Sequence, residues 1–445
     1  MAGELNVRRK RIVIVGGGFA GIAAARALKR CDAEIVLIDQ RNHHIFQPLL
    51  YQVATAVLAP SEIAAPMRQL AYKQKNVSVI LAEVTAVDLN SRSVDASCPG
   101  VGIRKLEFDY LVIATGMRPS YFGHPEFARY APGLKNLTDA ETIRAKILSA
   151  YELADMTDDE NERERQMTFV LVGAGPTGVE LAASMAQLAA VTLRGQFRRI
   201  DPARSSIILI EGGKRILPTF AERLAQKASG RLEKLGVRVM TGVKVEKVDE
   251  NGVVADGKRI PSATVLWTAG VAPSPLVKLL GAKTDRAGRV AVGALMNVED
   301  VTGVFVVGDA SSVVRNGRPV PGVAQAAIQQ GVCRTPDLRT DQGSRTKTSL
   351  QIFRQRQYGG CWQEFRDIRE RTPSHEWVRH LARLGLSASH VASTAAEPIA
   401  CAIPVVLVLF YWAARLAIDL GAAEGGRVSL AAEHRHHECG AHPTL

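Results

Sequence analysis

The chain has 445 residues, of which 47% are hydrophobic, and its formal net charge at pH 7 is +12. This length allows two or three domains with a substantial core. The positive charge would suit an anionic membrane surface or nucleic acid, but no nucleic-acid-binding motif accompanies it, so we expect no nucleic-acid partner.

The N-terminus superficially looks like a signal peptide. Residues 8–11 are all arginine or lysine, and the apolar stretch 12–15 that follows runs directly into a group of glycines. An h-region needs at least about 7 apolar residues, so this stretch is too short. We therefore expect a cytoplasmic location.

The first predicted elements are a strand, a glycine-rich turn and a helix. Residues 12–15 are β-branched throughout, which indicates a buried parallel strand. The turn after it has the spacing Gly-x-Gly-x-x-Gly, with glycines at Gly16, Gly18 and Gly21. In dinucleotide-binding motifs the first glycine allows the tight turn, the second lets backbone approach a pyrophosphate, and the third lets the helix pack closely. The next strand ends in Asp39, the expected partner of the ribose hydroxyls.

A second unit of the same kind follows the polar stretch 155–166, which we interpret as a solvated helix end or linker. Residues 169–172 predict a buried strand, and the turn after it has glycines at Gly173, Gly175 and Gly178. The following strand ends in Glu211, although Lys214 and Arg215 lie close by. An acid at this position favours NADH over NADPH, because a 2′-phosphate would need an arginine. Two complete units predict two dinucleotide-binding domains rather than chance glycine turns.

Six further segments lie between and after the two turns. They are Asn42 to Ala56, Ser61 to Pro66, Phe108 to Gly116, Thr268 to Gly270, Gly303 to Asp309 and Ala324 to Gln329. In combination they resemble the type II NADH:quinone oxidoreductases, also called alternative NADH dehydrogenases, over about residues 8–331. The resemblance implies an α/β fold with two Rossmann-like dinucleotide-binding domains, for FAD and NADH, the second inserted in the first. The FAD-binding domain would comprise residues 7–120 and 275–331, and the NADH-binding domain residues 121–274.

The resemblance also implies which residues bind the two cofactors. FAD would take the first turn and Asp39, and NADH the second turn and Glu211. Small residues would line the two crossings between the domains, close to each cofactor: Thr115 and Gly116 for FAD, and Ala269 and Gly270 for NADH. Gly308 and Asp309 would place a carboxylate on the ribityl chain of FAD, with Ala310 at a helix start beneath the flavin.

Three residues are expected at the reacting centre. Gln325 and Gln329 lie four residues apart on one face of the family's quinone-site helix, where an amide can donate to a quinone carbonyl without adding charge. Glu180 matches a family glutamate near the nicotinamide and flavin, and it would assist proton delivery. An alternative interpretation is that Glu180 is an acid favoured by the helix dipole in the first turn of its helix.

The cysteines and histidines predict no dithiol pair and no metal site. No Cys-x-x-Cys pair occurs, which excludes a thioredoxin-reductase-like dithiol and disfavours sulfide:quinone reduction. His43 and His44 are adjacent on an extended segment, where neighbouring side chains point in opposite directions. We interpret both as structural or FAD-adjacent.

The predicted reaction follows from these cofactors. NADH would pass a hydride to FAD, and two electrons would go on to a membrane quinone without proton pumping. We expect a peripheral protein on the cytoplasmic face of the inner membrane, and a homodimer is possible. Two alternatives remain open: another NADH:acceptor flavoprotein reductase, and an inactive nucleotide-binding remnant with an altered C-terminus.

The resemblance stops after Gln330 and Gly331, where the composition also changes. Most histidines, cysteines and tryptophans lie beyond residue 331. When permitted codons for residues 350–366 are read one base later they give FKYFDKGNMAVVGKNF, and residues 405–414 give WFWSYFTGQR, both of which are family-like. We therefore hypothesise a one-base frameshift near the codon of Val332, with residues 332–445 an atypical and poorly folded tail. The apolar run 399–414 would then be accidental, and the protein cytoplasmic if this tail cannot anchor it.

Resequencing the gene across the codons of Gly331 and Val332 tests this hypothesis. We expect a frame error equivalent to one surplus base there, whose removal would restore a complete membrane-associated NADH:quinone oxidoreductase. If the present frame stands, the chain is a truncated form of that enzyme with an unrelated tail, and impaired or absent activity becomes the expectation.

Overall fold

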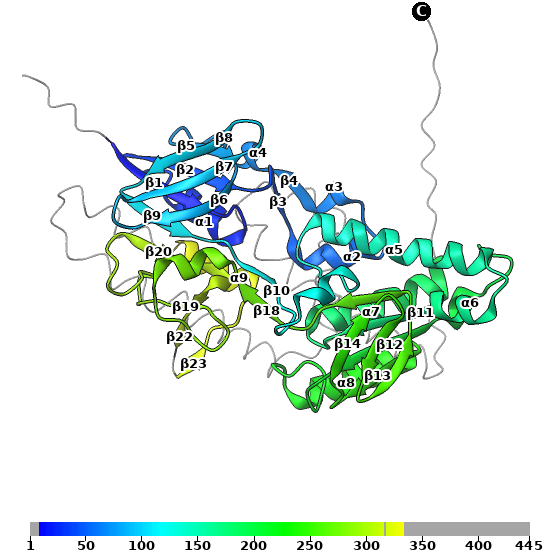
Figure 1. The fold of residues 1–445 in the computed structure, drawn as a ribbon. Coiled ribbons are helices and arrows are strands. Elements are labelled where there is room, and N and C mark those ends of the chain that lie inside the picture. The colour runs from blue at the N-terminus through cyan, green and yellow to red at the C-terminus, as the bar shows by residue number, and fades with distance from the viewer. Residues whose placement is uncertain (1–8, 316, 333–445) are drawn as a thin grey trace, which may run out of the picture. The chain divides into compact units, whose positions relative to one another are not determined.

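A computed structural model of the protein describes residues 9–315 and 317–332, which are coloured in Figure 1. The expectations for residues 333–445, including the family-like shifted frames and the apolar run, lie outside the described residues. Within the described part of the chain, no helix has both the length and the apolar character that crossing a membrane requires.

The first sheet has five parallel strands in the order β20-β9-β1-β2-β5. The strands are β1 (Lys10–Val15), β2 (Ala33–Asp39), β5 (Val77–Leu81), β9 (Tyr110–Ile113) and β20 (Val304–Val306). Alternate residues of β1 enter different clusters: Val13 and Val15 face one way, and Ile12 and Ile14 the other. Both faces of the sheet are therefore buried, which explains the unbroken β-branched run of β1.

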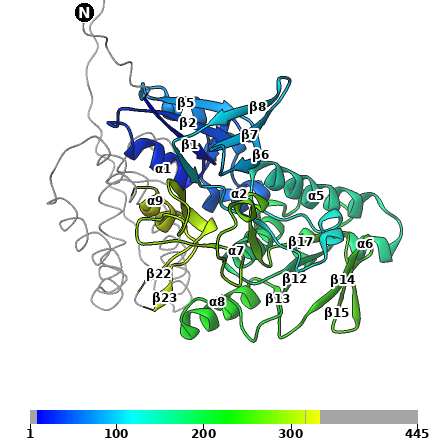
Figure 2. The ribbon, with the colours of Figure 1, turned by 60° about the vertical axis from the view of Figure 1, so that its left-hand side comes forward.

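Helices cover one face of this sheet and further strands cover the other (Figures 1 and 2). α1 (Phe19–Ala27) and α9 (Ala324–Val332) pack against each other on the first face. On the second face lies the antiparallel sheet β6-β7-β8, made of β6 (Glu83–Asp88), β7 (Ser93–Cys98) and β8 (Gly102–Glu107), together with η5 (Pro275–Leu280). Smaller pieces complete this half: η6 (Gly308–Ala310), β19 (Val290–Ala291), β21 (Ser311–Ser312), β22 (Val314–Arg315) and β23 (Arg318–Pro319).

The second sheet repeats the parallel arrangement with four strands, in the order β13-β12-β11-β17. They are β11 (Thr168–Val172), β12 (Ser206–Glu211), β13 (Val237–Thr241) and β17 (Thr264–Trp267). Around them lie α5 (Leu137–Met156), α7 (Pro176–Gln187), α8 (Glu222–Lys234), η2 (Pro125–Arg129), η3 (Leu188–Thr192), η4 (Pro202–Arg204) and the antiparallel strands β14 (Val245–Asp249), β15 (Gly252–Ala255) and β16 (Lys258–Pro261). Side chains from η2, β14 and β15 share a buried cluster with one face of the sheet.

The chain passes between the two sheets twice, and the two passages pair with each other. β10 (Met117–Pro119) is antiparallel to β18 (Val271–Pro273). After the second passage the chain returns to the first sheet and adds β20 beside β9. The α/β class with two Rossmann-like parallel sheets is confirmed, whereas the exact domain boundaries stay a prediction.

Residues 42–71 leave the first sheet after β2, reach the second unit and return to β5 through a series of short elements. They form β3 (His43–Ile45), η1 (Gln47–Leu49), α2 (Leu50–Ala54), α3 (Pro60–Ile63), β4 (Ala64–Pro66) and α4 (Met67–Ala71), with β3 antiparallel to β4. α2 packs against α5 and α7, which belong to the second unit. A short hydrogen bond of 2.6 Å between the buried hydroxyls of Thr55 and Ser184 joins the end of α2 to α7.

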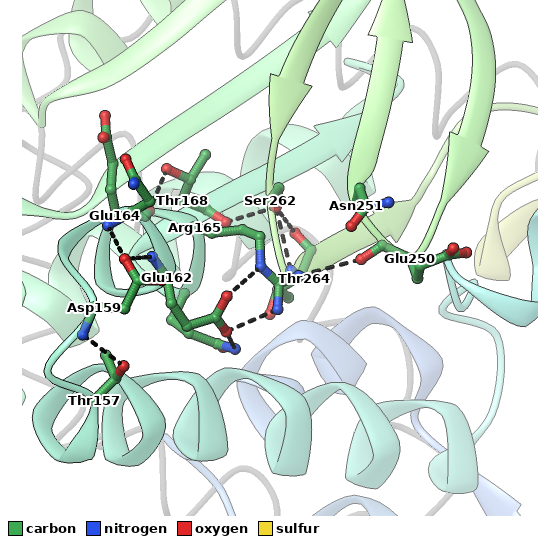
Figure 3. Close-up of polar contacts among 12 residues, drawn as sticks. Thr157, Asp159, Glu162, Glu164, Arg165, Thr168, Glu250, Asn251, Ser262 and Thr264 are labelled. Atoms are coloured by element: carbon green, nitrogen blue, oxygen red, sulfur yellow. Dashed lines mark hydrogen bonds and ion pairs between the residues drawn. The ribbon is translucent and has the colours of Figure 1, made fainter.

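The polar stretch before the second unit is more ordered than a solvated linker. Its later part forms α6 (Glu160–Gln166), with Asp159 as N-cap accepting the N–H groups of Asn161 and Glu162. Arg165 makes a two-pronged ion pair with Glu162, at 2.7 and 2.8 Å, and also donates to the carbonyl of Glu250 (Figure 3). This polar network anchors α6 beside the start of β11, so the helix belongs to the second unit.

Candidate nucleotide and redox site

The three glycines of the first turn meet very different surroundings. A Cβ atom on Gly16, whose φ is +105°, would lie 2.4 Å from the carbonyl oxygen of Ala114, and one on Gly21 would lie 1.8 Å from the carbonyl oxygen of Gly16. No atom lies within 4 Å of the corresponding position at Gly18. The outer two glycines therefore permit close packing, while the middle one faces open space.

The second turn shows the same pattern residue by residue. A Cβ atom on Gly173, whose φ is +102°, would lie 2.5 Å from the backbone of Ala269, and one on Gly178 would lie 2.0 Å from the carbonyl oxygen of Gly173. The position at Gly175 again has no atom within 4 Å. Gly18 and Gly175 are the N-caps of α1 and α7, and neither provides a side-chain acceptor. Open space before helix N–H groups is the environment that fits a pyrophosphate.

Each turn is tied to the acid at the end of the neighbouring strand. Asp39 accepts the N–H of Gly17 at 2.6 Å, and Glu211 accepts the N–H of Ala174 at 2.8 Å. Gly17 and Ala174 occupy the same position in the two turns. The second oxygen of each carboxylate accepts another backbone N–H, from Arg41 and Gly213 respectively. Carboxylate oxygens have further lone pairs, so both acids can still accept ribose hydroxyls.

The basic residues near Glu211 differ in their availability. Arg215 donates to the carbonyl oxygens of Phe220 at 3.0 Å and Pro218 at 2.8 Å, so its guanidinium braces the loop after β12. Lys214 is exposed. Arg215, which could have favoured NADPH by pairing with a 2′-phosphate, is therefore already hydrogen-bonded within its own loop.

The two crossing segments lie against the first glycine of each turn, as the close approaches of Ala114 and Ala269 show. Thr115 follows Ala114, and its Oγ1 is buried without a hydrogen-bond partner among the described residues. A buried hydroxyl of this kind is rare unless a ligand supplies its partner. Gly116 and Gly270 have φ values of +62° and +72°, which residues with side chains rarely adopt.

The predicted helix start at Ala310 is wrong. Gly308, Asp309 and Ala310 form the single 3₁₀ turn η6, and Ala310 is its last residue before β21. The reason is local: Ser311 takes an extended conformation and begins a two-residue pairing with β19. Burial raises the pKa of Asp309, while the positive charges of Lys135 and Arg289 oppose that rise.

Sequence reasoning missed Lys135, which faces this turn from the segment before α5. Burial lowers the pKa of its ammonium group, and the carboxylates of Asp309 and Asp139 oppose the shift. Lys135 lies in no recognised motif, and the only sequence signal was its place one residue before the Asn136 cap of α5. The charges of Lys135 and Asp309 therefore act on each other, although Lys135 belongs to the segment that leads into α5 of the second unit.

The position of Glu180 in its helix bears on the alternative interpretation of this residue. α7 begins at Pro176, so Glu180 lies beyond the first helical turn, which contains no acid. The helix-dipole interpretation is therefore wrong. Burial raises the pKa of Glu180 to about 8. Ser184, one turn further along the same face, bonds to Thr55, which places Glu180 on the side of α7 that meets α2.

Gln325 and Gln329 lie on α9 and are both half-buried. α9 packs on α1 beside the first turn, and Gly308 is joined to the same helix by a hydrogen bond from its N–H to Gln330. The described contacts thus bring the glutamine helix, η6 and the first turn together. The contacts of Glu180's helix are instead with α2 and the second sheet.

His44 lies beside the first turn. Its Nδ1 is 3.0 Å from the carbonyl oxygen of Gly17, and its ring stands edge-on to Phe19 at 5.1 Å. Burial lowers its pKa, against the raising effect of the bond to Gly17. Over residues 9–315 and 317–332, no group of three or more histidine, cysteine or acidic side chains is arranged to hold a metal ion.

Comparison with known proteins gives consistent results. The pyridine nucleotide-disulphide oxidoreductase family matches residues 10–331. The type II NADH:quinone oxidoreductase Ndh of Mycobacterium tuberculosis is 45% identical over 331 residues, covering 72% of this chain and 70% of the relative. NdhA of the same organism is 46% identical over 331 residues, covering 72% and 69%. The structure of NDH2 from Plasmodium falciparum in complex with NADH has a TM-score of 0.67 at 20% identity, covering 74% of this chain and 82% of that one, and it shows the shared fold.

Two alanine substitutions in the first turn test whether Gly21 is needed for packing and Gly18 for nucleotide binding. Gly21→Ala should destabilise the protein by about 1–3 kcal/mol or more, because its methyl group overlaps the carbonyl of Gly16. Gly18→Ala, the matched control, should unfold at nearly the parent temperature but bind its dinucleotide more weakly, because its methyl enters the open cradle. Thermal unfolding and nucleotide titration measure the two effects. Equal unfolding temperatures for both variants would contradict this assignment.

Proposed function

We propose that this chain, which belongs to the pyridine nucleotide-disulphide oxidoreductase family and within it to the type II NADH:quinone oxidoreductases, is an NADH:quinone oxidoreductase with FAD as its cofactor. Bound FAD would accept the hydride of NADH and supply two electrons to a membrane quinone, without proton pumping. The protein's own residues would bind and orient the two nucleotides and hold the proton that quinone reduction consumes.

The observation that supports this proposal is the duplicated turn. In both turns the middle glycine faces open space and caps a helix without a side-chain hydrogen bond. In both, an acid at the end of the neighbouring strand accepts a backbone N–H of the turn. The first turn, with Thr115, Gly116, Asp309 and Ala310, would hold FAD. The second, with Ala269 and Gly270, would hold NADH. We propose that residues 7–120 and 275–331 form the FAD-binding domain and that residues 121–274 form the NADH-binding domain.

The environment of Glu211 supports NADH as the electron donor. Its carboxylate is held by the N–H groups of Ala174 and Gly213, where a 2′-phosphate would meet negative charge. Arg215 is engaged with the carbonyls of Pro218 and Phe220. The loop would therefore have to rearrange before Arg215 could pair with NADPH.

The quinone would bind beside α9, where Gln325 and Gln329 offer uncharged amides on one face of the helix. Neutral donors suit a quinone carbonyl in an apolar setting, since they add no buried charge. We further propose peripheral attachment to the cytoplasmic face of the inner membrane, because a net charge of +12 favours an anionic lipid surface.

Assays of the chain as it stands and of a chain with the reading frame restored after Gly331 test the proposed function. We expect both to bind FAD, and the restored chain to reduce a quinone with NADH at least tenfold more efficiently than with NADPH. Reduction of soluble acceptors without quinone reduction would instead support another NADH:acceptor reductase. FAD binding without NADH-driven quinone reduction by the chain as it stands would support an inactive remnant.

Glu180→Gln tests the proton-holding role. Since burial raises the pKa of Glu180 to about 8, its carboxyl is protonated at pH 7 and loses that proton above pH 8. We expect kcat to fall by about 10²-fold and the decline of parent activity above pH 8 to disappear.

The same variant should change stability with a defined sign. The pKa of a glutamate carboxyl in the unfolded chain is about 4.3. Because the pKa of Glu180 in the folded protein is higher, the folded state binds more protons than the unfolded state between about pH 4.3 and 8, and the free energy of unfolding falls as pH rises through that range. The unfolding temperature of Glu180→Gln minus that of the parent should therefore be larger at pH 8 than at pH 5. Exposed Glu222→Gln is the matched control and should show neither change. An unaltered pH profile for Glu180→Gln would remove the residue from proton transfer.

A further inference from the structure

One buried side chain beside the proposed FAD site has no role in the function described so far. Gln330 lies on α9, one residue after Gln329, and is only 7% exposed. Buried amides are seldom tolerated unless they make hydrogen bonds, so its partners show what the residue is for.

The partners of Gln330 are the first residue of η6 and the residue that follows η6. Its Oε1 accepts the N–H of Gly308 at 2.6 Å and lies 3.0 Å from the hydroxyl of Ser311. The same hydroxyl is 2.8 Å from the carbonyl oxygen of Gly308. These contacts bracket Asp309, which has only Ala310 between it and Ser311.

Close packing leaves Gln330 little freedom to move. A Cβ atom on Gly331 would lie 2.4 Å from the carbonyl oxygen of Ala20, so α9 sits directly on the backbone of α1. A Cβ atom on Gly308 would lie 3.0 Å from the Cβ of Ala20, so η6 approaches the same helix. Gly308 also has a φ of +74°, which aims its N–H in a direction that an ordinary residue rarely provides.

We propose that Gln330 is a positioning residue that holds Asp309 in place for FAD, so that α9 serves the flavin as well as the quinone. Its oxygen holds the N–H of the Val307–Gly308 peptide, and the Ser311 hydroxyl beside it holds the carbonyl of the Gly308–Asp309 peptide. Together these bonds set where the carboxylate of Asp309 stands. The helix that presents Gln325 and Gln329 to the quinone is thereby linked to the flavin segment. This inference rests on the proposed function, since it takes FAD as the ligand of Asp309.

FAD affinity of the full chain is the measurement that tests the proposal. Gln330→Met keeps the length of the side chain but removes the acceptor, which leaves the N–H of Gly308 buried without its partner. Titration of the apoprotein with FAD, followed by flavin fluorescence, should show about tenfold weaker binding, equivalent to about 1.4 kcal/mol. The rise in unfolding temperature on adding FAD should shrink in parallel.

Two further variants separate positioning from general damage to the fold. Gln166→Met removes an equally buried glutamine, which donates to Glu162 in the second unit, and it should leave FAD affinity within twofold of the parent. Gln330→Glu retains an oxygen acceptor at the same place. Its FAD affinity should approach that of the parent as pH is lowered, because a neutral carboxyl bonds to Gly308 without repelling Asp309. A purely structural role predicts no such rescue.

The possible results are distinct. Weaker FAD binding by Gln330→Met with pH-dependent rescue by Gln330→Glu supports the proposal, and parent-like FAD affinity in folded Gln330→Met overturns it. If Gln330→Met does not fold, Ser311→Ala decides: binding two- to fivefold weaker supports the proposal and unchanged binding overturns it. A parent chain that does not bind FAD overturns the proposed function itself, which no result with the Gln330 variants alone would do.

Discussion

The whole arrangement depends on backbone segments approaching each other where a side chain would not fit. Gly16 and Gly21 let the first turn, α1 and the segment around Ala114 touch, and Gly173 and Gly178 do the same in the second unit. Gly331 extends this packing by letting α9 settle on α1. Because protein interiors are close-packed, these contacts fix the openings at Gly18 and Gly175 instead of leaving them to side-chain adjustment.

The electrostatic environment follows from the same geometry. In each sheet the acid, Asp39 or Glu211, stands at the end of the strand beside the one that leads into the glycine turn. Backbone N–H groups of the turns hold both carboxylates, so each is placed before any nucleotide arrives. Glu180 and Asp309 differ from them in having pKa values raised by burial. Acids with backbone donors suit recognition of ribose, whereas Glu180, whose pKa burial raises to about 8, can hold a proton near neutral pH.

Local pattern was sufficient for the parts of the fold in which each residue depends on its sequence neighbours. The strands ending at Val15, Asp39, Val172 and Glu211 could be predicted because apolar runs and glycine spacing are local signals. α7, which carries Glu180, packs against α2 from far earlier in the chain. Lys135 and Asp309, whose charges act on each other, are likewise far apart in sequence. No sequence pattern distinguishes Gln330 from the neighbouring Gln329. The hydrogen bond of Gln330 to Gly308 becomes apparent only in the structure.

The late return of the chain to the first sheet has a consequence for biosynthesis. β20 pairs with β9, although the whole second sheet is encoded between them. The strands of the second sheet follow one another without interruption by the first sheet, whereas β9 keeps one edge unpaired until β20 has been made. Pairing across so long a separation is slow. An unpaired strand edge is a template for pairing with another chain, so the edge of β9 is open to such pairing until residues 304–306 have emerged.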